Sequence, residues 1–284
     1  MTQPRPTGPF GARLHAAMAE RGRLCAGLDP HASLLRAWGL ADDVAGLERF
    51  ALAAAEALAP VVPVVKPQSA FYERFGSRGM AVLERVVETC REAGALVLLD
   101  VKRGDIGSTS QAYADAYLDP VSPLAVDAIT ASPFLGVGSL RPMVDTARKH
   151  GAGLFVLALT SNPEGPEVQG AVGADGRTVA GRVLDELRDL NRDEVRSGPL
   201  GSFGAVVGAT LDGTDEDLDI HGPLLVPGYG AQGGTVDDIR RIFGPVSGSV
   251  LASSSRGLLE AGPDAAALRD AAGRATDDLA GLAR

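Results

Sequence analysis

The feature that most limits the fold of this chain is the regular return of short, apolar, β-prone runs. Continuous hydrophobicity in such runs predicts strands that are buried on both faces, as in a parallel sheet. Eight occur along the 284 residues: LCAGLD (24–29), VVPVVKP (61–67), LVLLDVK (96–102), AVDAITAS (125–132), GLFVLALTS (153–161), GAVVGAT (204–210), PLLVPG (223–228) and SVLASSS (249–255).

Amphipathic stretches that predict helices separate most of these runs. In residues 81–94, apolar side chains recur every fourth residue, and Gly94 stands where the helix is expected to end. Eight strand–helix units in about 260 residues predict an α/β fold, a closed (β/α)8 TIM barrel forming a single domain over residues 1–284. A further helix over residues 10–22 precedes the first strand and is expected to cover the barrel floor.

An open, doubly wound sheet is the main alternative to a barrel. It is the weaker one because the first strand ends in AGLDP, without the GxGxxG motif of dinucleotide-binding sheets. Two connections fit a barrel less well than the others. The link LDGTDEDLDIHG (211–222) leaves room for little more than two helical turns, and the link over 162–203 is long and begins with a loop rich in Gly and Pro.

Composition excludes several classes of protein. The net charge is −9 and no Lys/Arg-rich block occurs, which argues against nucleic acid as a partner. Cys25 and Cys90 both lie in apolar runs, as expected of buried thiols in a reducing compartment. No apolar run approaches the roughly 18 residues of a membrane span, and the start MTQPRPTGPF does not resemble a signal peptide. We therefore expect a cytoplasmic protein that does not bind a membrane.

Charged residues gather at the ends of three successive strands. Asp29 ends the first, Lys66 the second, and Asp100 and Lys102 the third, with Asp105 in the loop that follows. Active sites of TIM barrels lie at this rim, and strand alternation puts Asp100 and Lys102 on one face. A solvated ion pair on an edge strand would explain Asp100 and Lys102 alone. Buried charges at three strand ends favour a mutually paired catalytic cluster, because isolated buried charges are costly.

The last two strands carry a second signal. The seventh runs into PGYGAQGG (227–234) and the eighth into SSSRG (253–257). In TIM barrels these two loops often bind phosphate, and glycines let backbone N–H groups approach an anion. Gln232 and Arg256 are the candidate side-chain ligands, with Arg256 suited to a two-pronged contact. The alternative is a plain turn before a helix.

At this point the sequence resembles the orotidine 5'-phosphate decarboxylase family, in particular a longer bacterial subgroup. The resemblance rests on D-x-K-x-x-D at 100–105 together with Asp29, Lys66, PGYGAQGG and Arg256, and it covers nearly the whole chain. VVKPQSAFYE and SNPEG add to it. D-x-K-x-x-D alone is less specific, because related sugar-phosphate lyases share it.

The resemblance implies decarboxylation of orotidine 5'-monophosphate to UMP in pyrimidine biosynthesis, without a metal or other cofactor. It implies that Lys102 protonates C6 of the pyrimidine and that Asp100 lies beside the departing carboxyl group. It further implies a homodimer with shared active sites. The other implied roles are ribose and network contacts for Lys66 and Asp29, a contribution to the partner's site from Asp105 with Ile106 and Thr109, a pyrimidine contact for Ser161, and phosphate contacts for Gln232 and Arg256.

Three rival functions remain open at this stage. A Mg-dependent keto-sugar-phosphate decarboxylase or lyase of the same superfamily would lose activity with EDTA. A Schiff-base aldolase would use Lys66 or Lys102 as nucleophile, but neighbouring carboxylates favour protonated lysine. A non-catalytic nucleotide sensor would bind without turnover, and it would have no need of a buried Lys–Asp array.

Overall fold

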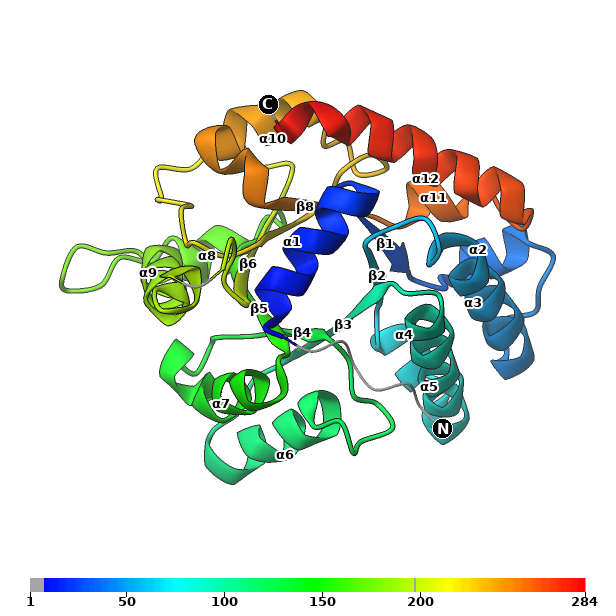
Figure 1. The fold of residues 1–284 in the computed structure, drawn as a ribbon, viewed down its shortest axis with the longest axis horizontal. Helices are drawn as coiled ribbons and strands as arrows, with labels where there is room; N and C mark the ends of the chain where they lie inside the picture. The colour runs from blue at the N-terminus through cyan, green and yellow to red at the C-terminus, as the bar shows by residue number, and fades with distance from the viewer. Residues whose placement is uncertain (1–7, 197, 284) are drawn as a thin grey trace.

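The eight apolar runs form one closed parallel barrel whose strands follow one another in chain order (Figure 1). The computed structural model describes residues 8–196 and 198–283. Each strand pairs with the next, and the last closes the ring on the first, so the predicted barrel is confirmed. The strands are β1 (Leu24–Leu28), β2 (Val64–Pro67), β3 (Leu96–Arg103), β4 (Ala128–Ala131), β5 (Gly153–Leu159), β6 (Phe203–Val207), β7 (Leu224–Pro227) and β8 (Val250–Ser254).

Helices surround the barrel and bury their apolar faces against the outer side of the strands. None within the described ranges has the length and apolar character that a membrane crossing requires. The helices are α1 (Phe10–Arg21), α2 (Ala32–Ala37), α3 (Val44–Leu58), α4 (Ala70–Glu73), α5 (Gly76–Glu92), α6 (Gly107–Leu118), α7 (Arg141–His150), α8 (Gly165–Gln169), α9 (Val179–Asn191), α10 (Val236–Phe243), α11 (Arg256–Leu259) and α12 (Ala265–Leu279), with 3-10 turns η1 (Val137–Leu140), η2 (Glu194–Arg196), η3 (Gly244–Ser249) and η4 (Ala280–Ala283).

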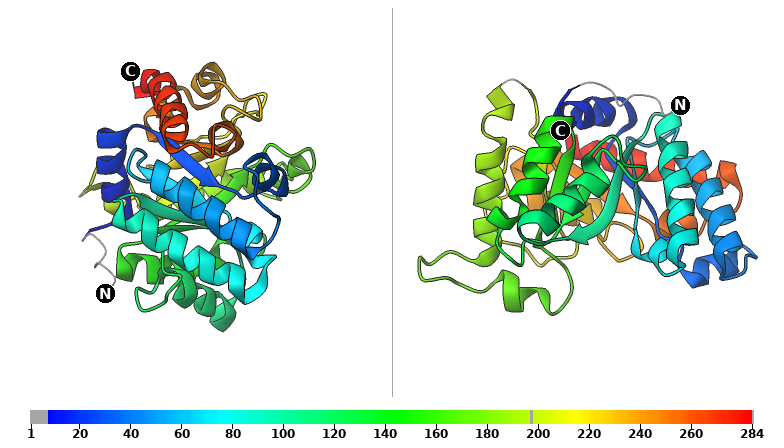
Figure 2. Two further views of the ribbon diagram at one scale, coloured as in Figure 1. Left: turned by 90° about the vertical axis from the view of Figure 1, so that its right-hand side faces the viewer. Right: turned by 90° about the horizontal axis from the view of Figure 1, so that it is seen from below.

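Helix α1 lies across one end of the barrel, opposite the loop that carries α8 (Figure 2). Its apolar side chains pack into the same cluster as the inward-facing residues of the strands, and Phe10 meets the ring of Phe155 edge to face at 6.0 Å. Arg13 adds a buried ion pair with Asp127 at 2.6 Å and donates to the carbonyl of Gly151. The bottom of the barrel is therefore plugged, and the opposite rim is left for a site.

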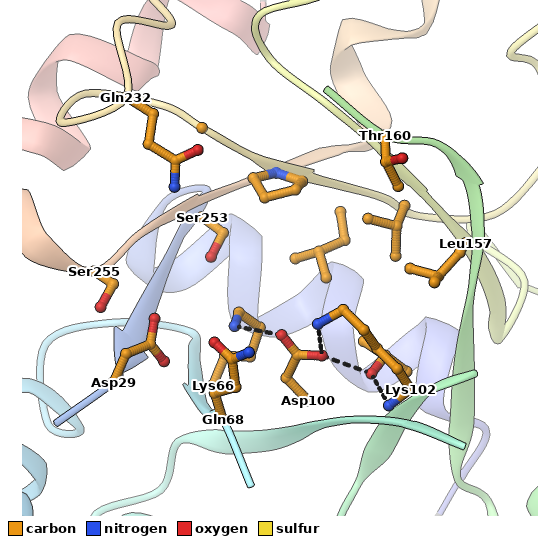
Figure 3. A pocket seen from close by; sticks show the side chains of 15 residues that line it. Asp29, Lys66, Gln68, Asp100, Lys102, Leu157, Thr160, Gln232, Ser253 and Ser255 are labelled. Atoms are coloured by element: carbon orange, nitrogen blue, oxygen red, sulfur yellow. Dashed lines mark hydrogen bonds and ion pairs between the residues drawn. The ribbon is translucent and has the colours of Figure 1, made fainter. Parts of the chain in front are cut away.

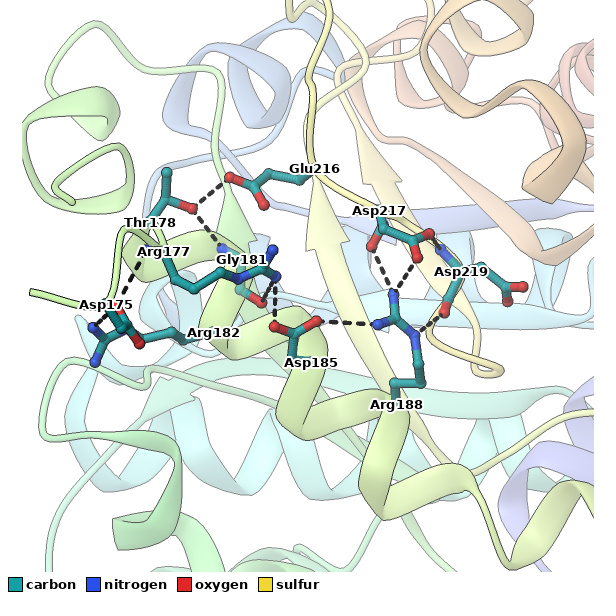
Figure 4. A network of polar contacts seen from close by, with 10 residues as sticks. All are labelled: Asp175, Arg177, Thr178, Gly181, Arg182, Asp185, Arg188, Glu216, Asp217 and Asp219. Atoms are coloured by element: carbon teal, nitrogen blue, oxygen red, sulfur yellow. Dashed lines mark hydrogen bonds and ion pairs between the residues drawn. The ribbon is translucent and has the colours of Figure 1, made fainter. Parts of the chain in front are cut away.

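The connection between β6 and β7 departs from the predicted repeat. The described residues 208–223 contain no helix, so one of the eight expected strand–helix units is incomplete. Positive φ angles at Gly213 and His221 interrupt a right-handed helix there. Arg188 of α9 holds the loop instead, through the carbonyl of Asp219 at 2.6 Å and the carboxylate of Asp217 at 2.8 Å (Figure 4).

Candidate active site

Four charged side chains from three consecutive strand ends meet at the open rim of the barrel. Asp29 follows β1, Lys66 lies in β2, and Asp100 and Lys102 lie in β3. The Asp100 carboxylate sits between two ammonium groups: Lys66 Nζ is 3.2 Å from Oδ2 and Lys102 Nζ is 2.6 Å from Oδ1 (Figure 3). The Lys66 and Asp100 side chains are only 7% and 10% exposed, so this is a largely desolvated pair rather than a surface one.

The charges in this cluster hold one another ionised. Burial alone would lower the pKa of Lys66, but the neighbouring carboxylates of Asp100 and Asp29 outweigh it and raise that pKa above its ordinary value. Burial alone would raise the pKa of Asp100, but Lys66 and Lys102 outweigh it and lower that pKa well below its usual range. At neutral pH Asp100 therefore stays a carboxylate and Lys66 stays an ammonium group.

The backbone at Lys102 is not that of a regular strand. Simple alternation predicts that Lys102 joins Asp100, and the side chains do meet, but Lys102 has a φ of 46°, in the left-handed region. The pairing of β3 with β4 shifts register between Leu99 and Arg103. A non-glycine residue in this conformation is strained and is characteristic of functional sites. The meeting of Asp100 and Lys102 thus depends on a local bulge as well as on alternation.

A cavity of about 240 Å³ opens above this cluster. In it, Asp29 is 8% exposed, and its Oδ1 is a buried atom with no hydrogen-bond partner among the described residues. An orphaned carboxylate oxygen beside a cavity is suited to accept from a ligand hydroxyl. The cavity is lined by Asp29, Lys66, Gln68, Asp100, Lys102, Thr130, Leu157, Thr160, Val206, Leu225, Pro227, Gly228, Gln232, Ser253 and Ser255.

A second cavity, of about 320 Å³, continues the first toward the loops after β7 and β8. Asp29 and Gln232 line both cavities, whereas Arg256 lines only the second. Gly228 and Gly230 have φ angles of 103° and 78°, which L side chains rarely adopt, so the loop needs glycine there. The predicted phosphate ligands Gln232 and Arg256 therefore share a polar extension of the cavity. No cluster of three His, Cys, Asp or Glu suited to a metal occurs in the described part of the chain.

Comparison with known proteins decides the family. Residues 22–271 match the model of the orotidine 5'-phosphate decarboxylase / HUMPS family. The chain is 68% identical over 274 residues to orotidine 5'-phosphate decarboxylase of a Nocardioides species, covering 95% of this chain and 98% of the relative. The chain belongs to this decarboxylase family.

Two further comparisons agree with that membership. The Streptomyces coelicolor orotidine 5'-phosphate decarboxylase is 62% identical over 267 residues, covering 94% of this chain and 95% of the relative. A crystal structure from Streptomyces avermitilis, assigned to the same activity, superposes with a TM-score of 0.94 at 58% identity, covering 100% of this chain and 99% of the other. Both the fold and the sequence thus belong to the decarboxylase branch over nearly the whole chain.

The remaining residues expected from the decarboxylase family lie outside the cavity in this single chain. The hydroxyl-bearing residue of TSNP that lines the catalytic cavity is Thr160, whereas Ser161 is exposed just beyond it. Asp105 accepts a hydrogen bond from the amide of Ile106 at 2.8 Å, and Ile106 and Thr109 are exposed. The described residues that line the catalytic cavity therefore do not include Ser161, Asp105, Ile106 or Thr109. Their predicted roles would require closure of a loop or a second chain.

Thr130 and Gln68 are among the polar residues of the site that were not predicted from the sequence. Thr130 of β4 donates to Asp100 Oδ1 at 2.8 Å, and Gln68 lines both cavities beside Asp29. The feature of the sequence that could indicate Thr130 is a hydroxyl at an inward-facing position of an otherwise apolar strand. Gln68 lies within VVKPQSAFYE, and its position directly after a strand end could indicate that it belongs to the site.

Proposed function

We propose that Lys102 supplies the proton in the reaction of this chain, the decarboxylation of orotidine 5'-monophosphate to UMP. The arrangement that carries the proposal is the Asp100 carboxylate flanked by Lys66 and Lys102 at 3.2 and 2.6 Å inside the cavity. When the C6–carboxyl bond breaks, CO2 leaves and its bonding electron pair stays on C6. The ammonium of Lys102 stabilises this charge and then transfers a proton to C6. Solvent returns a proton to the neutral lysine.

Asp100 has two tasks in this proposal. Its carboxylate fixes both ammonium groups, and it faces the carboxyl group that the substrate loses. Repulsion between the two carboxylates raises the energy of the bound substrate and disappears when CO2 departs. The low pKa of Asp100 supports this role, because the group stays charged while a second anion binds.

Binding energy comes from the parts of the substrate that do not react. The unpartnered Oδ1 of Asp29 supports a contact with a ribose hydroxyl. Gln232 and Arg256, in the polar extension of the cavity, support binding of the 5'-phosphate. Such remote contacts orient the reacting carbon against Lys102. Ser161 is assigned to the pyrimidine, which requires its loop to move inward.

We further propose a homodimer in which Asp105, Ile106 and Thr109 complete the site of the partner. The Asp105 carboxylate is held by its own neighbouring amide, outside the cavity of its own chain. Ile106 is 63% exposed and Phe134 is 77% exposed, which is unusual for large apolar side chains near a functional rim. Phe134 also borders an apolar cavity of about 370 Å³ that shares Leu157 with the catalytic cavity. A second chain covering this face would bury that surface.

We also propose a cytoplasmic location for the chain. Cys25 and Cys90 are free and buried, and burial raises the pKa of each thiol to about 12. Such thiols stay protonated and unreactive, in keeping with a reducing compartment. Cell fractionation that found the protein elsewhere would contradict this location.

The direct test follows the loss of orotidine 5'-monophosphate absorbance, with and without EDTA. We expect equal rates in both conditions. A rate abolished by EDTA and restored by Mg²⁺ would instead favour the metal-dependent lyase chemistry of the wider family.

The proton-donor role is tested by two substitutions of Lys102. Lys102→Ala should lower kcat by about 10³-fold or more, while UMP still binds. Lys102→Arg keeps a positive charge but holds its proton too tightly to give it up, so it should be nearly as slow. A Lys102→Arg enzyme close to wild-type rate would show that only the charge is needed.

A further inference from the structure

The hydroxyl of Thr130 lies between the catalytic carboxylate and the strained backbone of Lys102. Thr130 is 1% exposed and belongs to β4, next to the β3 bulge. Its Oγ1 accepts from the amide of Val101 at 3.0 Å and from the amide of Lys102 at 2.9 Å. The same oxygen donates to Asp100 Oδ1 at 2.8 Å. One side chain thus contacts three successive residues of the catalytic strand.

The register shift explains why a hydroxyl is needed there. Leu98 and Leu99 pair with Ala128 and Ile129 in the regular ladder, and pairing resumes only at Arg103. Val101 and Lys102 fall in the gap, and their amides turn to a side chain rather than to a strand carbonyl. Buried amides without an acceptor are costly, so Thr130 replaces the missing carbonyl.

The hydrogen-bonding capacity of the hydroxyl fixes its direction. A hydroxyl offers two lone pairs and one proton. Both lone pairs of Thr130 are occupied by the two amides, so its proton points to Asp100 Oδ1, which also accepts from Lys102 Nζ at 2.6 Å. The position of the carboxylate and the φ of Lys102 are therefore set by the same atom.

We propose that Thr130 is a positioning residue, whose hydroxyl holds Asp100 and the left-handed backbone of Lys102 in the geometry needed for proton transfer. This inference rests on the proposed function of Lys102 and Asp100. Thr130 lines the catalytic cavity beside Asp100 and Lys102, but it is not among the residues of the second cavity, where Arg256 lies. Its loss should therefore affect the chemical step far more than substrate binding.

The test compares Thr130→Val with Thr130→Ser. Thr130→Val keeps the shape but removes the hydroxyl, and we expect kcat to fall by about 100-fold while KM changes by less than about threefold. Thr130→Ser keeps the hydroxyl and should restore kcat to within about fivefold of wild type. Thr146→Val is the matched control, because it removes another buried threonine hydroxyl, in α7, which among the described residues accepts from Gln111 at 3.1 Å and has no contact with the catalytic strand.

Each outcome decides a separate point. Thr130→Val with kcat within about threefold of wild type, or Thr130→Ser as slow as Thr130→Val, would overturn the positioning role. If Thr146→Val lowered kcat as much as Thr130→Val does, the effect at Thr130 would be one of general structural stability and not of positioning. If Thr130→Val does not fold, Thr130→Cys replaces it, since a thiol is a weak donor and acceptor and the same fall is expected. A wild-type chain that leaves orotidine 5'-monophosphate unchanged would refute the proposed function itself.

Discussion

At the scale of single residues, Asp100 sets the charge balance of the site. It is the carboxylate that Lys66 and Lys102 share, at 3.2 and 2.6 Å. Its folded pKa is lowered, so ionised Asp100 stabilises the native state at pH values above about 4, and that contribution is lost as the pH falls below it. The folded pKa of Lys66 is raised, so its contribution is complete below about pH 10 and is lost at higher pH. Between these limits both contributions are constant.

Asp100→Asn should make stability depend on pH in the neutral to alkaline range. Breaking this buried pair leaves Lys66 with only the more distant carboxylate of Asp29 to offset its burial, and we expect a loss of about 3 kcal/mol in the free energy of unfolding at pH 7. Burial then lowers the folded pKa of Lys66 below its unfolded value, so the variant recovers stability as the pH rises toward 10. Urea unfolding of wild type and variant at pH 6 to 10 measures the difference.

A second buried ion pair supplies the control for this experiment. Asp127 pairs with Arg13 at the opposite end of the barrel, with side-chain exposures of 5% and 9%. Asp127→Asn should also destabilise the chain, but arginine does not lose its proton below pH 10, so that loss should not vary with pH. An equally flat profile for Asp100→Asn would mean that Lys66 does not titrate after the substitution.

The sequence predicted the charged residues of the site but not the geometry that joins them. Asp29, Lys66 and Asp100 stand at strand ends, where position in the repeat indicates which rim they share. The positive φ of Lys102 and the hydroxyl bridge from Thr130 could not be predicted, because a bulge arises from pairing between two strands. A local sequence pattern does not show which side chain of a neighbouring strand will accept hydrogen bonds in place of a missing strand carbonyl.

At the scale of elements, the loops after β7 and β8 line the second cavity, where we propose that the phosphate binds. Gly228 and Gly230 give the first loop its positive φ angles, and Arg256 begins α11 after β8. Within the described parts of the chain, no ion pair or hydrogen bond engages the side chain of Arg256, which is exposed beside the second cavity. An arginine without a partner beside Gly-rich backbone is suited to an incoming anion.

Arg256→Ala should weaken only ligands that carry the phosphate. Loss of a charge-assisted contact should raise KM for orotidine 5'-monophosphate by about 10- to 100-fold. Binding of uridine, which lacks phosphate, should not change, whereas binding of UMP should weaken in parallel with KM. Inhibition constants for the two ligands provide the comparison, with Arg269→Ala, an exposed arginine of α12, as the control. Equal weakening of uridine would contradict the assignment.

The connections show where prediction by repeat fails. Strand–helix alternation predicted the barrel, because each parallel strand needs a crossover of sufficient length. The link between β6 and β7 makes that crossover as a loop. Arg188 of α9 stabilises this loop by contacting the carboxylate of Asp217 and the backbone carbonyl of Asp219. The partner of an acidic run lies 29 to 31 residues away in sequence, so no local pattern reveals it.

At the scale of the whole molecule, one chain leaves part of the predicted site unfilled. Asp105 and Thr109 lie beyond the described lining of the catalytic cavity. Lys102 is 45% exposed in its side chain although Asp100 beside it is 10% exposed. A partner chain would cover this open side of the cluster and bring an acidic group toward Lys102. In this proposal, the dimer is therefore part of the catalytic apparatus and not only a way to bury apolar surface.

Mixing two inactive variants tests whether the site is shared. Asp105→Ala and Lys102→Ala chains, each inactive alone, should regain activity after subunit exchange, because a hybrid dimer holds one site with both residues intact. Random exchange makes half of the dimers hybrid, each with one of two sites intact, so about a quarter of wild-type activity is expected. Lys66→Ala mixed with Lys102→Ala is the matched control: both residues come from the same chain, and no hybrid site is complete. Subunit exchange is verified with differently tagged chains. If exchange occurs but the first mixture regains no activity, Asp105 acts in the site of its own chain.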